Sequence, residues 1–278
     1  MKIAIISDIH GNLEALKATL KDIAKRDIDK IICLGDIIAK GIHTKECIKL
    51  LRDKCDVIIQ GNCDRVFSDI YEDIDSIPVQ ERNRIKWNQA MINEEEREFL
   101  HNLPFCYEFY MSGSLVRVFH ATPEVDNRAV INLDSIETKY NMFLPSQNTI
   151  SQNVADVVIY GHIHHPYMDK LYNKTLICAG SVGNSFDVIR NEDKDSSVLE
   201  TTKSNYLILE GSYGSKEYTD EISFQFVKVP YDIKKELMDQ DCNIEKDDYA
   251  YELTEGKYRD MSKINANFIR LGIDVDKI

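Results

Sequence analysis

Residues 2–12 read KIAIISDIHGN, an apolar run that ends in an aspartate and a histidine two positions apart. Asp8 and His10 allow two interpretations. Either they are ordinary turn residues after a strand, or they are the first two ligands of a metal site that is completed elsewhere in the chain. The other strand-like segments distinguish these interpretations, because further ligands would have to reach the same edge of a sheet.

Continuous apolar segments of strand length recur along the chain, which predicts strands that are covered on both faces. Amphipathic helices are predicted over residues 13–26 and 44–53, the second capped by Thr44. The alternation of strand and helix predicts parallel strands joined by right-handed crossovers, and therefore an α/β fold. The apolar segments span residues 2–7, 30–35, 56–61, 115–120, 156–161 and 175–181.

Three other parts of the chain have a different composition. Residues 65–104 predict a helical insertion in which Asn93 caps the last helix. The polar stretch after residue 190 predicts an exposed loop, and two further strands are expected over residues 205–211 and 222–232. We expect one domain over residues 1–278, with a core of residues 1–232 and an acidic, helical C-terminal extension of residues 233–278.

The composition excludes several classes of protein. No apolar run approaches the roughly 20 residues that a membrane span requires, and the N-terminus lacks the pattern of a signal peptide. The seven cysteines form no CxxC pair, which indicates free thiols and a cytoplasmic location. The net charge of −13 argues against a nucleic-acid partner, which usually binds a basic face.

Polar residues of a restricted kind follow the apolar segments. Any one of them alone is explained by a turn, a helix cap or a satisfied polar side chain. Four of the seven histidines fall at such positions together with three acid or amide groups, so coincidence is a poor explanation. The residues are Asp8, His10, Asp36, Asn62, His120, His162 and His164.

This mixture of ligand types favours particular metals. Carboxylate and amide oxygens together with imidazole suit Mn²⁺, Fe or Zn²⁺, whereas a set of thiolates would indicate structural zinc or an iron–sulfur cluster. One shared carboxylate can hold two ions about 3.5–4 Å apart, the arrangement used for displacement at phosphorus. Gly35, Gly61 and Gly161 allow the backbone to turn tightly beneath such a site.

The ordered blocks D-x-H, G-D, G-N-C-D, H and G-H-x-H resemble the signature of the calcineurin-like metallophosphoesterase superfamily. The segment GSVGN (180–184) is similar to the last core segment of that family, and the resemblance covers residues 1–232. It implies a four-layer αββα sandwich of two mixed β-sheets with a dinuclear metal centre at the strand ends.

The resemblance also implies roles for individual residues. The first ion would be held by Asp8, His10, Asp36 and His164, and the second by Asp36, Asn62, His120 and His162. The expected ions are Mn²⁺ or Fe, with Zn²⁺ or Ni²⁺ as alternatives, and a hydroxide that bridges them would be the nucleophile. The catalytic residues would be Asp36, Asn62, Asp64 and His120.

Within the superfamily the chain looks closest to small bacterial phosphodiesterases and diadenosine-polyphosphate hydrolases, whose tails are similar to VPYDIKKEL (229–237). The expected substrate is a small phosphorylated molecule such as a nucleotide, cleaved at a phosphodiester or phosphoanhydride bond. Residues 35–41 depart from the G-D-x-V-D-R-G block of serine/threonine phosphatases, but a phosphomonoester phosphatase remains an alternative. A non-catalytic scaffold is a further alternative, against which the complete ligand set argues.

The third block has Cys63 where many family members have a histidine that protonates the leaving group. Since a thiol is a poor substitute, we interpret Cys63 as a packing residue beneath the site. Asp64 would then orient no imidazole and could cap the following helix. Candidate substrate contacts are the polar residues close to the ligand blocks, namely Asn12, Arg65, Arg128 and His165.

Overall fold

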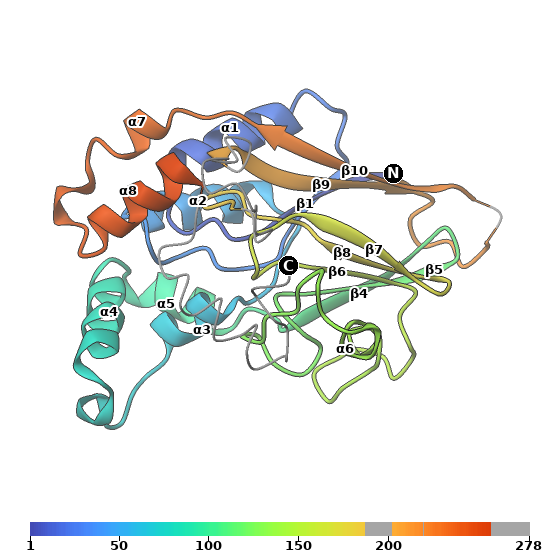
Figure 1. Cartoon of the computed structure of the whole chain (residues 1–278), viewed down its shortest axis with the longest axis horizontal. Helices are drawn as coiled ribbons and strands as arrows, with labels where there is room; N and C mark the ends of the chain where they lie inside the picture. The colour runs from blue at the N-terminus through green and yellow to red at the C-terminus, as the bar shows by residue number, and fades with distance from the viewer. Residues whose placement is uncertain (187–201, 219, 257–278) are drawn as a thin grey trace.

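The computed structural model describes residues 1–186, 202–218 and 220–256. Two mixed five-stranded sheets lie face to face, with helices on their outer sides (Figure 1). The strand order is β10-β9-β1-β2-β3 in the first sheet and β4-β5-β6-β8-β7 in the second. This confirms the predicted sandwich of two mixed sheets.

The first sheet contains β1 (Lys2–Ile6), β2 (Lys30–Cys33), β3 (Val57–Ile58), β9 (Ser204–Gly211) and β10 (Ile222–Val229). The second contains β4 (Cys106–Met111), β5 (Ser114–Phe119), β6 (Val157–Tyr160), β7 (Tyr167–Leu171) and β8 (Lys174–Cys178). As predicted, β1, β2 and β3 are parallel neighbours, and so are β5, β6 and β8.

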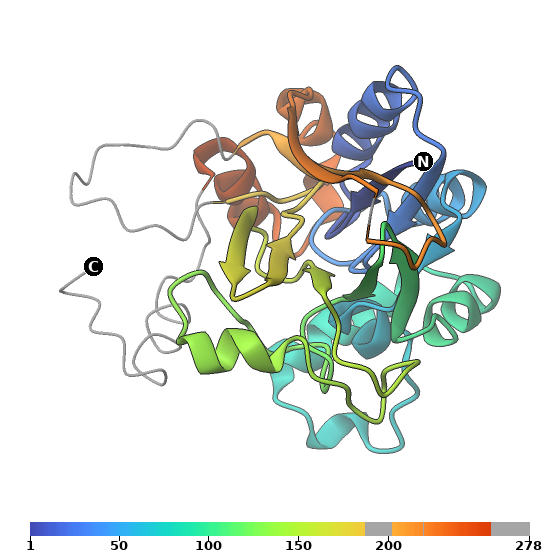
Figure 2. The ribbon, with the colours of Figure 1, turned by 90° about the vertical axis from the view of Figure 1, so that its right-hand side faces the viewer.

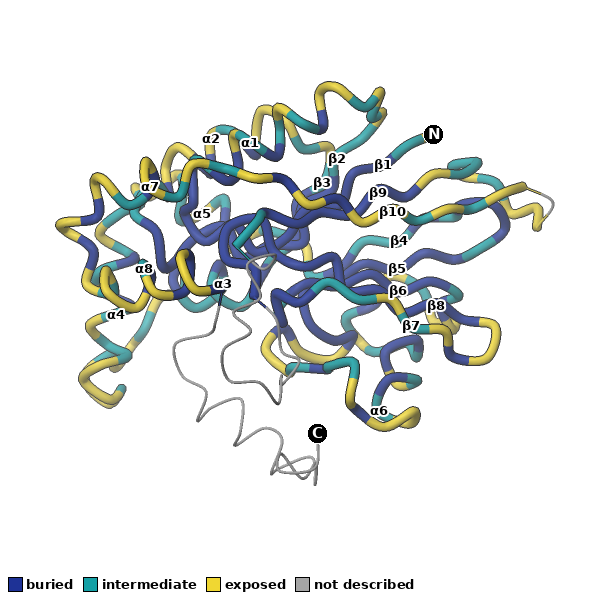
Figure 3. Tube along the Cα trace, turned by 45° about the horizontal axis from the view of Figure 1, so that its top comes forward, coloured by how far each residue is buried: buried dark blue, intermediate teal, exposed yellow. Residues whose placement is uncertain are grey.

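Apolar side chains form three layers, one between the sheets and one on each outer face. In β1, Ile3 and Ile5 point into the layer between the sheets, whereas Ala4 and Ile6 pack under the helices of the first sheet. Because both faces are covered, the run is apolar throughout rather than alternating. Figure 3 shows the same arrangement, with buried strands at the centre and exposed helical surfaces outside.

Helices α1 (Leu13–Ile23) and α2 (Thr44–Lys54) cover the outer face of the first sheet, where Leu16 and Leu51 are buried. The predicted cap of α2 is wrong. His43 is the N-cap residue and Thr44 is the first helical residue, and the cap makes no side-chain hydrogen bond. Propensity favours threonine at a cap, but here Thr44 is buried and already lies within the helix, one residue after the N-cap position.

The predicted insertion is helical and contains α3 (Asn62–Ser68), η1 (Ile74–Ser76), α4 (Val79–Ala90) and α5 (Glu94–His101). The side chain of Asn93 accepts a hydrogen bond from the backbone N–H of Glu96, while the Glu96 carboxylate accepts one from the backbone N–H of Asn93. This reciprocal capping confirms the predicted start of α5.

Two strands and one helix were not predicted from the sequence, namely β4, β7 and α6 (Ile136–Asn141). In β4, Glu108 lies opposite Arg117 of β5, and their side chains form a buried ion pair 2.6 Å long. A charged residue interrupts the apolar run by which a buried strand is predicted. The charge that compensates it lies on another strand, so the sequence around β4 gives no sign that Glu108 can be buried. Figure 2 shows α6 beside the second sheet, where Phe143 extends the outer apolar layer.

The C-terminal extension is helical over the described residues, with α7 (Ile233–Glu236), η3 (Gln240–Cys242) and α8 (Lys246–Glu255). Its remaining part, residues 257–278, and most of the predicted loop after residue 190 lie outside the described residues. Among the helices of the described ranges, none has the length and apolarity that crossing a bilayer requires.

Candidate metal centre

The seven predicted ligands lie at the carboxyl ends of strands from both sheets. Asp8, His10, Asp36 and Asn62 follow β1, β2 and β3 in the first sheet, and the three histidines follow β5 and β6 in the second. Parallel strands present their carboxyl ends at the same edge, and the two edges meet here. The side chains form two groups with Asp36 between them.

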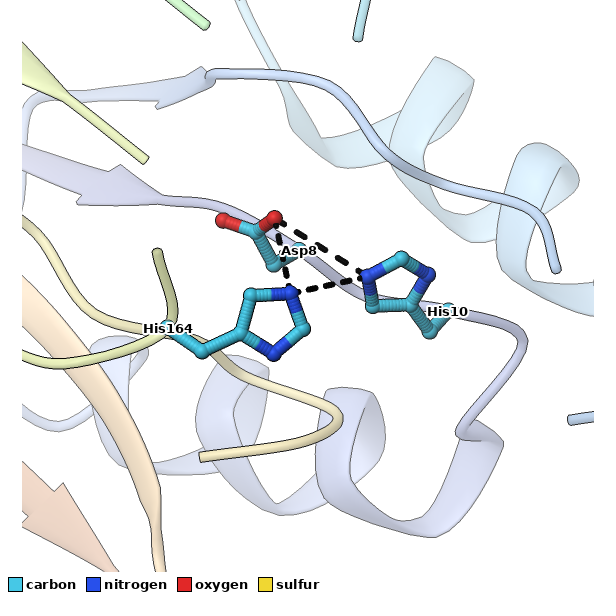
Figure 4. A group of neighbouring side chains, drawn as sticks. All are labelled: Asp8, His10 and His164. Carbon is cyan, nitrogen blue, oxygen red and sulfur yellow. Dashed lines mark hydrogen bonds and ion pairs between the residues drawn. The ribbon is translucent and has the colours of Figure 1, made fainter. Parts of the chain in front are cut away.

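The first group, called the inner group, consists of Asp8, His10 and His164. Figure 4 shows both imidazole rings pointing towards the Asp8 carboxylate. His164 Nε2 lies 3.2 Å from Asp8 Oδ1 and 3.1 Å from His10 Nε2. All three side chains are buried, with at most 5% of each residue exposed. The inner group is therefore a compact set of one oxygen and two nitrogen donors.

The second group, called the outer group, consists of Asn62, His120 and His162. His120 Nε2 lies 3.1 Å from Asn62 Oδ1, and the rings of His120 and His162 are 5.2 Å apart between centroids. Asn62 and His162 are partly exposed, whereas His120 is buried. The outer group therefore faces the surface more than the inner group does.

Asp36 lies between the two groups. Its Oδ2 atom is 3.7 Å from His10 Nε2 and 3.4 Å from His120 Nε2. Its other oxygen, Oδ1, accepts a hydrogen bond of 2.8 Å from the backbone N–H of Cys63. One carboxylate is thus close to donors of both groups.

The imidazole rings are oriented by backbone carbonyls. Nδ1 of His10 lies 3.1 Å from the carbonyl oxygen of Ile38, and Nδ1 of His120 lies 2.8 Å from that of Leu34. A carbonyl only accepts, so each Nδ1 carries a proton, and each Nε2 is the ring nitrogen that faces the centre. Such outer contacts hold the ligands of metal sites in place.

The backbone carries strain at this position. Five of the seven ligand residues have positive φ values, with 54° at Asp8 and 65° at His162. Left-handed conformations are uncommon outside glycine and concentrate at functional sites. A Cβ at Gly161 would lie 2.6 Å from Asp8 Oδ2, which explains why the predicted small residue is needed there. The five residues are Asp8, His10, Asp36, His162 and His164.

Burial and neighbouring charges shift the pKa values of the clustered residues in different directions. Burial opposes ionisation of Asp8, but the neighbouring His164 outweighs it and lowers the pKa of Asp8 to about 2. Burial lowers the pKa of His10 to about 3 and that of His162 to about 4. For His120 burial acts the same way, but Asp36 outweighs it and raises the pKa to about 10.

These residues fit divalent cations. Asp8 and Asp36 are both buried carboxylates with lowered pKa values, and such a pair requires compensating positive charge. Asp8 Oδ1 is buried and has no hydrogen-bond partner. Carboxylate oxygens and imidazole nitrogens are donors that Mn²⁺, Fe and Zn²⁺ accept.

Residues 1–205 match the family model of the calcineurin-like phosphoesterase superfamily domain. The chain belongs to the calcineurin-like phosphoesterase superfamily. It is also 33% identical, over 84% of its length and 89% of the other chain, to an uncharacterized protein of Methanocaldococcus jannaschii.

Solved structures agree on the fold of this phosphoesterase-family chain. A metallophosphoesterase from Sphaerobacter thermophilus aligns with a TM-score of 0.67 and 21% identity, covering 92% of this chain and 100% of that one. A hypothetical protein of Pyrococcus horikoshii aligns with a TM-score of 0.68 and 18% identity, covering 92% of this chain and 99% of that one. At these identities the likeness concerns the architecture.

Asp64 lies behind the ligands of this phosphoesterase-family site. Its carboxylate accepts hydrogen bonds from the backbone N–H groups of Asp36, Ile37 and Gly61, at 2.7, 2.8 and 3.0 Å. Burial, together with the charge of Asp36, raises the pKa of Asp64 to about 7. These contacts hold the loop that carries Asp36, and the one with Gly61 caps α3, as the sequence suggested. A catalytic role of Asp64 remains a prediction.

Cys63 lies closer to the ligand atoms than its interpretation as a packing residue implied. Its Sγ belongs to a group with donor atoms of His10 and Asp36 that all lie within 4.8 Å of one another. Burial raises the pKa of its thiol. All seven cysteines lie within the described residues and are free thiols, as expected.

Asn12 and Arg65, two predicted substrate contacts, have partners inside the protein. Asn12 is fully buried and caps α1, accepting from the N–H of Ala15 and donating to the carbonyl of Gly183. Arg65 donates twice to the carboxylate of Asp126, at 2.5 and 3.0 Å. Asn12 therefore serves the fold in this structure, and Arg65 connects α3 to the loop after β5.

The other two predicted contacts differ in exposure. Arg128 is exposed and donates to Glu124 on the same loop, at 3.0 Å. His165 is buried next to the ligand His164, and its ring stacks on Tyr167 with 6.3 Å between centroids. Contact of either residue with a substrate remains a prediction.

Sequence reasoning missed the contact of Asn184 with the inner group. Nδ1 of His164 lies 2.5 Å from the carbonyl oxygen of Asn184 and 3.2 Å from its side-chain oxygen. Asn184 ends the GSVGN segment, which was used only for the family resemblance. The signal that could have identified Asn184 was its place in the GSVGN segment, which follows the next apolar segment after the G-H-x-H block.

Proposed function

We propose that this chain is a metal-dependent hydrolase that cleaves phosphoric ester or anhydride bonds at a dinuclear centre. The inner group would hold one ion, the outer group would hold the other, and Asp36 would be shared by both. The observation that carries the proposal is the position of Asp36 Oδ2, 3.7 Å from His10 Nε2 and 3.4 Å from His120 Nε2. Mn²⁺ or Fe are the ions that we expect, with Zn²⁺ or Ni²⁺ as alternatives.

The residues of the chain have separate tasks in this proposal. Divalent ions bound here would act as Lewis acids on a phosphoryl oxygen and lower the pKa of water. The three histidines with Nδ1 anchored on carbonyl oxygens keep Nε2 aimed at the centre. The partly exposed Asn62 and His162 lie where a substrate phosphate can approach.

The leaving group indicates the class of substrate. Cys63 occupies the position after Asn62, and its raised thiol pKa makes it a weak general acid at neutral pH. A bond whose leaving group departs as a stable anion needs little protonation. We therefore propose phosphoanhydrides, such as dinucleoside polyphosphates, and aryl phosphodiesters as substrates, in preference to alkyl phosphomonoesters.

A turnover panel with purified chain and Mn²⁺ tests this function. The panel contains an aryl phosphomonoester, an aryl phosphodiester, diadenosine tetraphosphate and a phosphoserine peptide, each assayed with and without a chelator. We expect chelator-sensitive turnover of the diester or the anhydride and weak turnover of the peptide. Preference for the phosphoserine peptide would overturn the substrate class, and no turnover with any of the metals named would overturn the hydrolase proposal.

A further inference from the structure

A buried ion pair joins the loop after β2 to the C-terminal helix α8. Lys40 Nζ lies 3.0 Å from Glu252 Oε2, and the two side chains are 9% and 1% exposed. Lys40 also donates to Asn184 Oδ1 at 3.1 Å, and Asn184 Nδ2 donates to Glu252 Oε2 at 2.8 Å. The three side chains thus form a closed ring of hydrogen bonds, with one member from each of three distant segments.

The ring is connected to the inner group through Asn184. The side-chain amide of Asn184 is held at both ends, by Lys40 on its oxygen and by Glu252 on its nitrogen. Its backbone N–H donates to Ser181 Oγ at 2.8 Å. His164 Nδ1 faces the two oxygens of this fixed residue, so the orientation of the imidazole depends on the ring.

The same extension also holds the backbone next to His10. Ala39 and Lys40 have φ values of 81° and 65°, which are unfavourable for residues with a Cβ. The carbonyl oxygen of Lys40 accepts a hydrogen bond of 2.6 Å from Asn243 Nδ2. The adjacent Gly41 N–H donates to the His10 carbonyl at 2.9 Å, so this strained segment touches the inner group directly.

We propose that Glu252 is a positioning residue of the metal centre, which acts on His164 through Asn184 and on the His10 loop through Lys40. This inference rests on the proposed function in one respect, because it takes His164 to be a ligand. Glu252 also places a negative charge 3.0 Å from the buried Lys40 ammonium, and breaking a buried ion pair is unfavourable. The C-terminal extension is thereby part of the site.

The test compares Glu252→Gln with Glu255→Gln, since Glu255 is an exposed residue on the same helix. Titration of the metal-free chains with Mn²⁺, followed by calorimetry, should show roughly 10- to 100-fold weaker binding for Glu252→Gln and no change for Glu255→Gln. The second measurement needs no metal: the Nδ1–H resonance of His164, in protein labelled with ¹⁵N-histidine and assigned with His164→Gln, should shift in Glu252→Gln only.

A double variant separates positioning from folding. Lys40→Met/Glu252→Met removes both charges of the pair, so neither is left buried without the other, and the melting temperature should stay within a few degrees of that of the original chain. Mn²⁺ binding should nevertheless remain weak, because Asn184 has lost both partners. Unchanged Mn²⁺ affinity in this variant and in Glu252→Gln, with an unshifted His164 resonance, overturns the inference. If the original chain binds no Mn²⁺ while the resonance shifts as described, the proposed function fails and the link from Glu252 to His164 stands.

Discussion

The inner and outer groups of the candidate centre use the same kinds of donor but differ in what lies behind them. The inner group is buried, and its His164 is held through Asn184 by residues of α8. The outer group has two partly exposed members, Asn62 and His162, and lies next to the helical insertion that begins with α3. From this comparison we expect the inner group to hold the more tightly bound ion of the proposed pair, and the outer group to face the substrate.

The largest effect is expected where both groups fail together. Asp36→Asn weakens the one ligand that they share, so metal content and turnover should both fall by at least about 100-fold, since even changes behind a ligand cost 10- to 100-fold. Metal analysis and kinetics measure this. Asp53→Asn, at an exposed position, is the control. Two bound ions with near-normal turnover would show that Asp36 is not shared.

Separating the two groups is the next test. His162→Gln removes a donor from the outer group alone, so the bound Mn²⁺ should fall from two equivalents to one while turnover drops at least about 10-fold. His164→Gln should instead weaken the ion that binds more tightly. Titration of the metal-free chains distinguishes the two results. Loss of the same ion in both variants would contradict the assignment of separate ions to the inner and outer groups.

A smaller effect is expected at the position that selects the leaving group. Cys63→His restores an imidazole at this position, and general acid catalysis is typically worth about 10²–10⁴-fold. We expect the rate on an alkyl monoester to rise relative to the rate on an anhydride, by about 10-fold or more. Cys63→Ser is the matched control. An unchanged ratio of the two rates for Cys63→His would show that leaving-group protonation does not limit the proposed reaction.

The smallest effect concerns Glu236, a buried residue of α7 in the C-terminal extension. Burial raises the pKa of Glu236 in α7 from its usual 4.5 to about 7, although hydrogen bonds from the backbone N–H of Glu14 and from Tyr249 oppose the rise. The folded chain therefore binds this proton more tightly than the unfolded chain, so the stabilisation is fully present below pH 4.5 and is lost as the pH rises through 7.

Glu236→Gln removes this titration. Between pH 6 and pH 8 the variant should lose less stability than the original chain, by about 1–2 kcal/mol. Thermal or urea unfolding at the two pH values measures the difference, with Glu255→Gln as the exposed control. Parallel pH profiles for the Glu236→Gln variant and the original chain would contradict the raised pKa.

The sequence predicted those parts of the molecule that a local pattern describes. Continuous apolar runs identified strands such as β1 and β6 because both faces of these strands are covered. The candidate ligands were then identified as the polar residues that come directly after these runs. The strand β4 escaped because the partner of Glu108 lies on another strand. The role of Glu252 was not predicted for the same reason. Its partner Lys40 is 212 positions away in the sequence, and no periodic pattern relates residues so far apart.

The positive φ values were also beyond sequence reasoning. Aspartate and histidine tolerate this conformation better than branched residues do, but tolerance alone does not predict it. The tight packing of the five ligand loops, for example of Gly61 against Asp36, imposes the conformation.

The candidate centre also has a mechanical consequence. Its ligands come from loops of both sheets, with Asp8 and Asp36 on one side and His120 and His164 on the other. Ions held here would link loops of both sheets, in addition to the apolar layer between the sheets and the contact of His120 Nδ1 with the Leu34 carbonyl, and their binding energy would stabilise the sandwich. At a free ion concentration 100 times the Kd this contribution amounts to about 2.7 kcal/mol per site. When metal is scarce, the chain would then lose stability of the fold as well as the proposed activity.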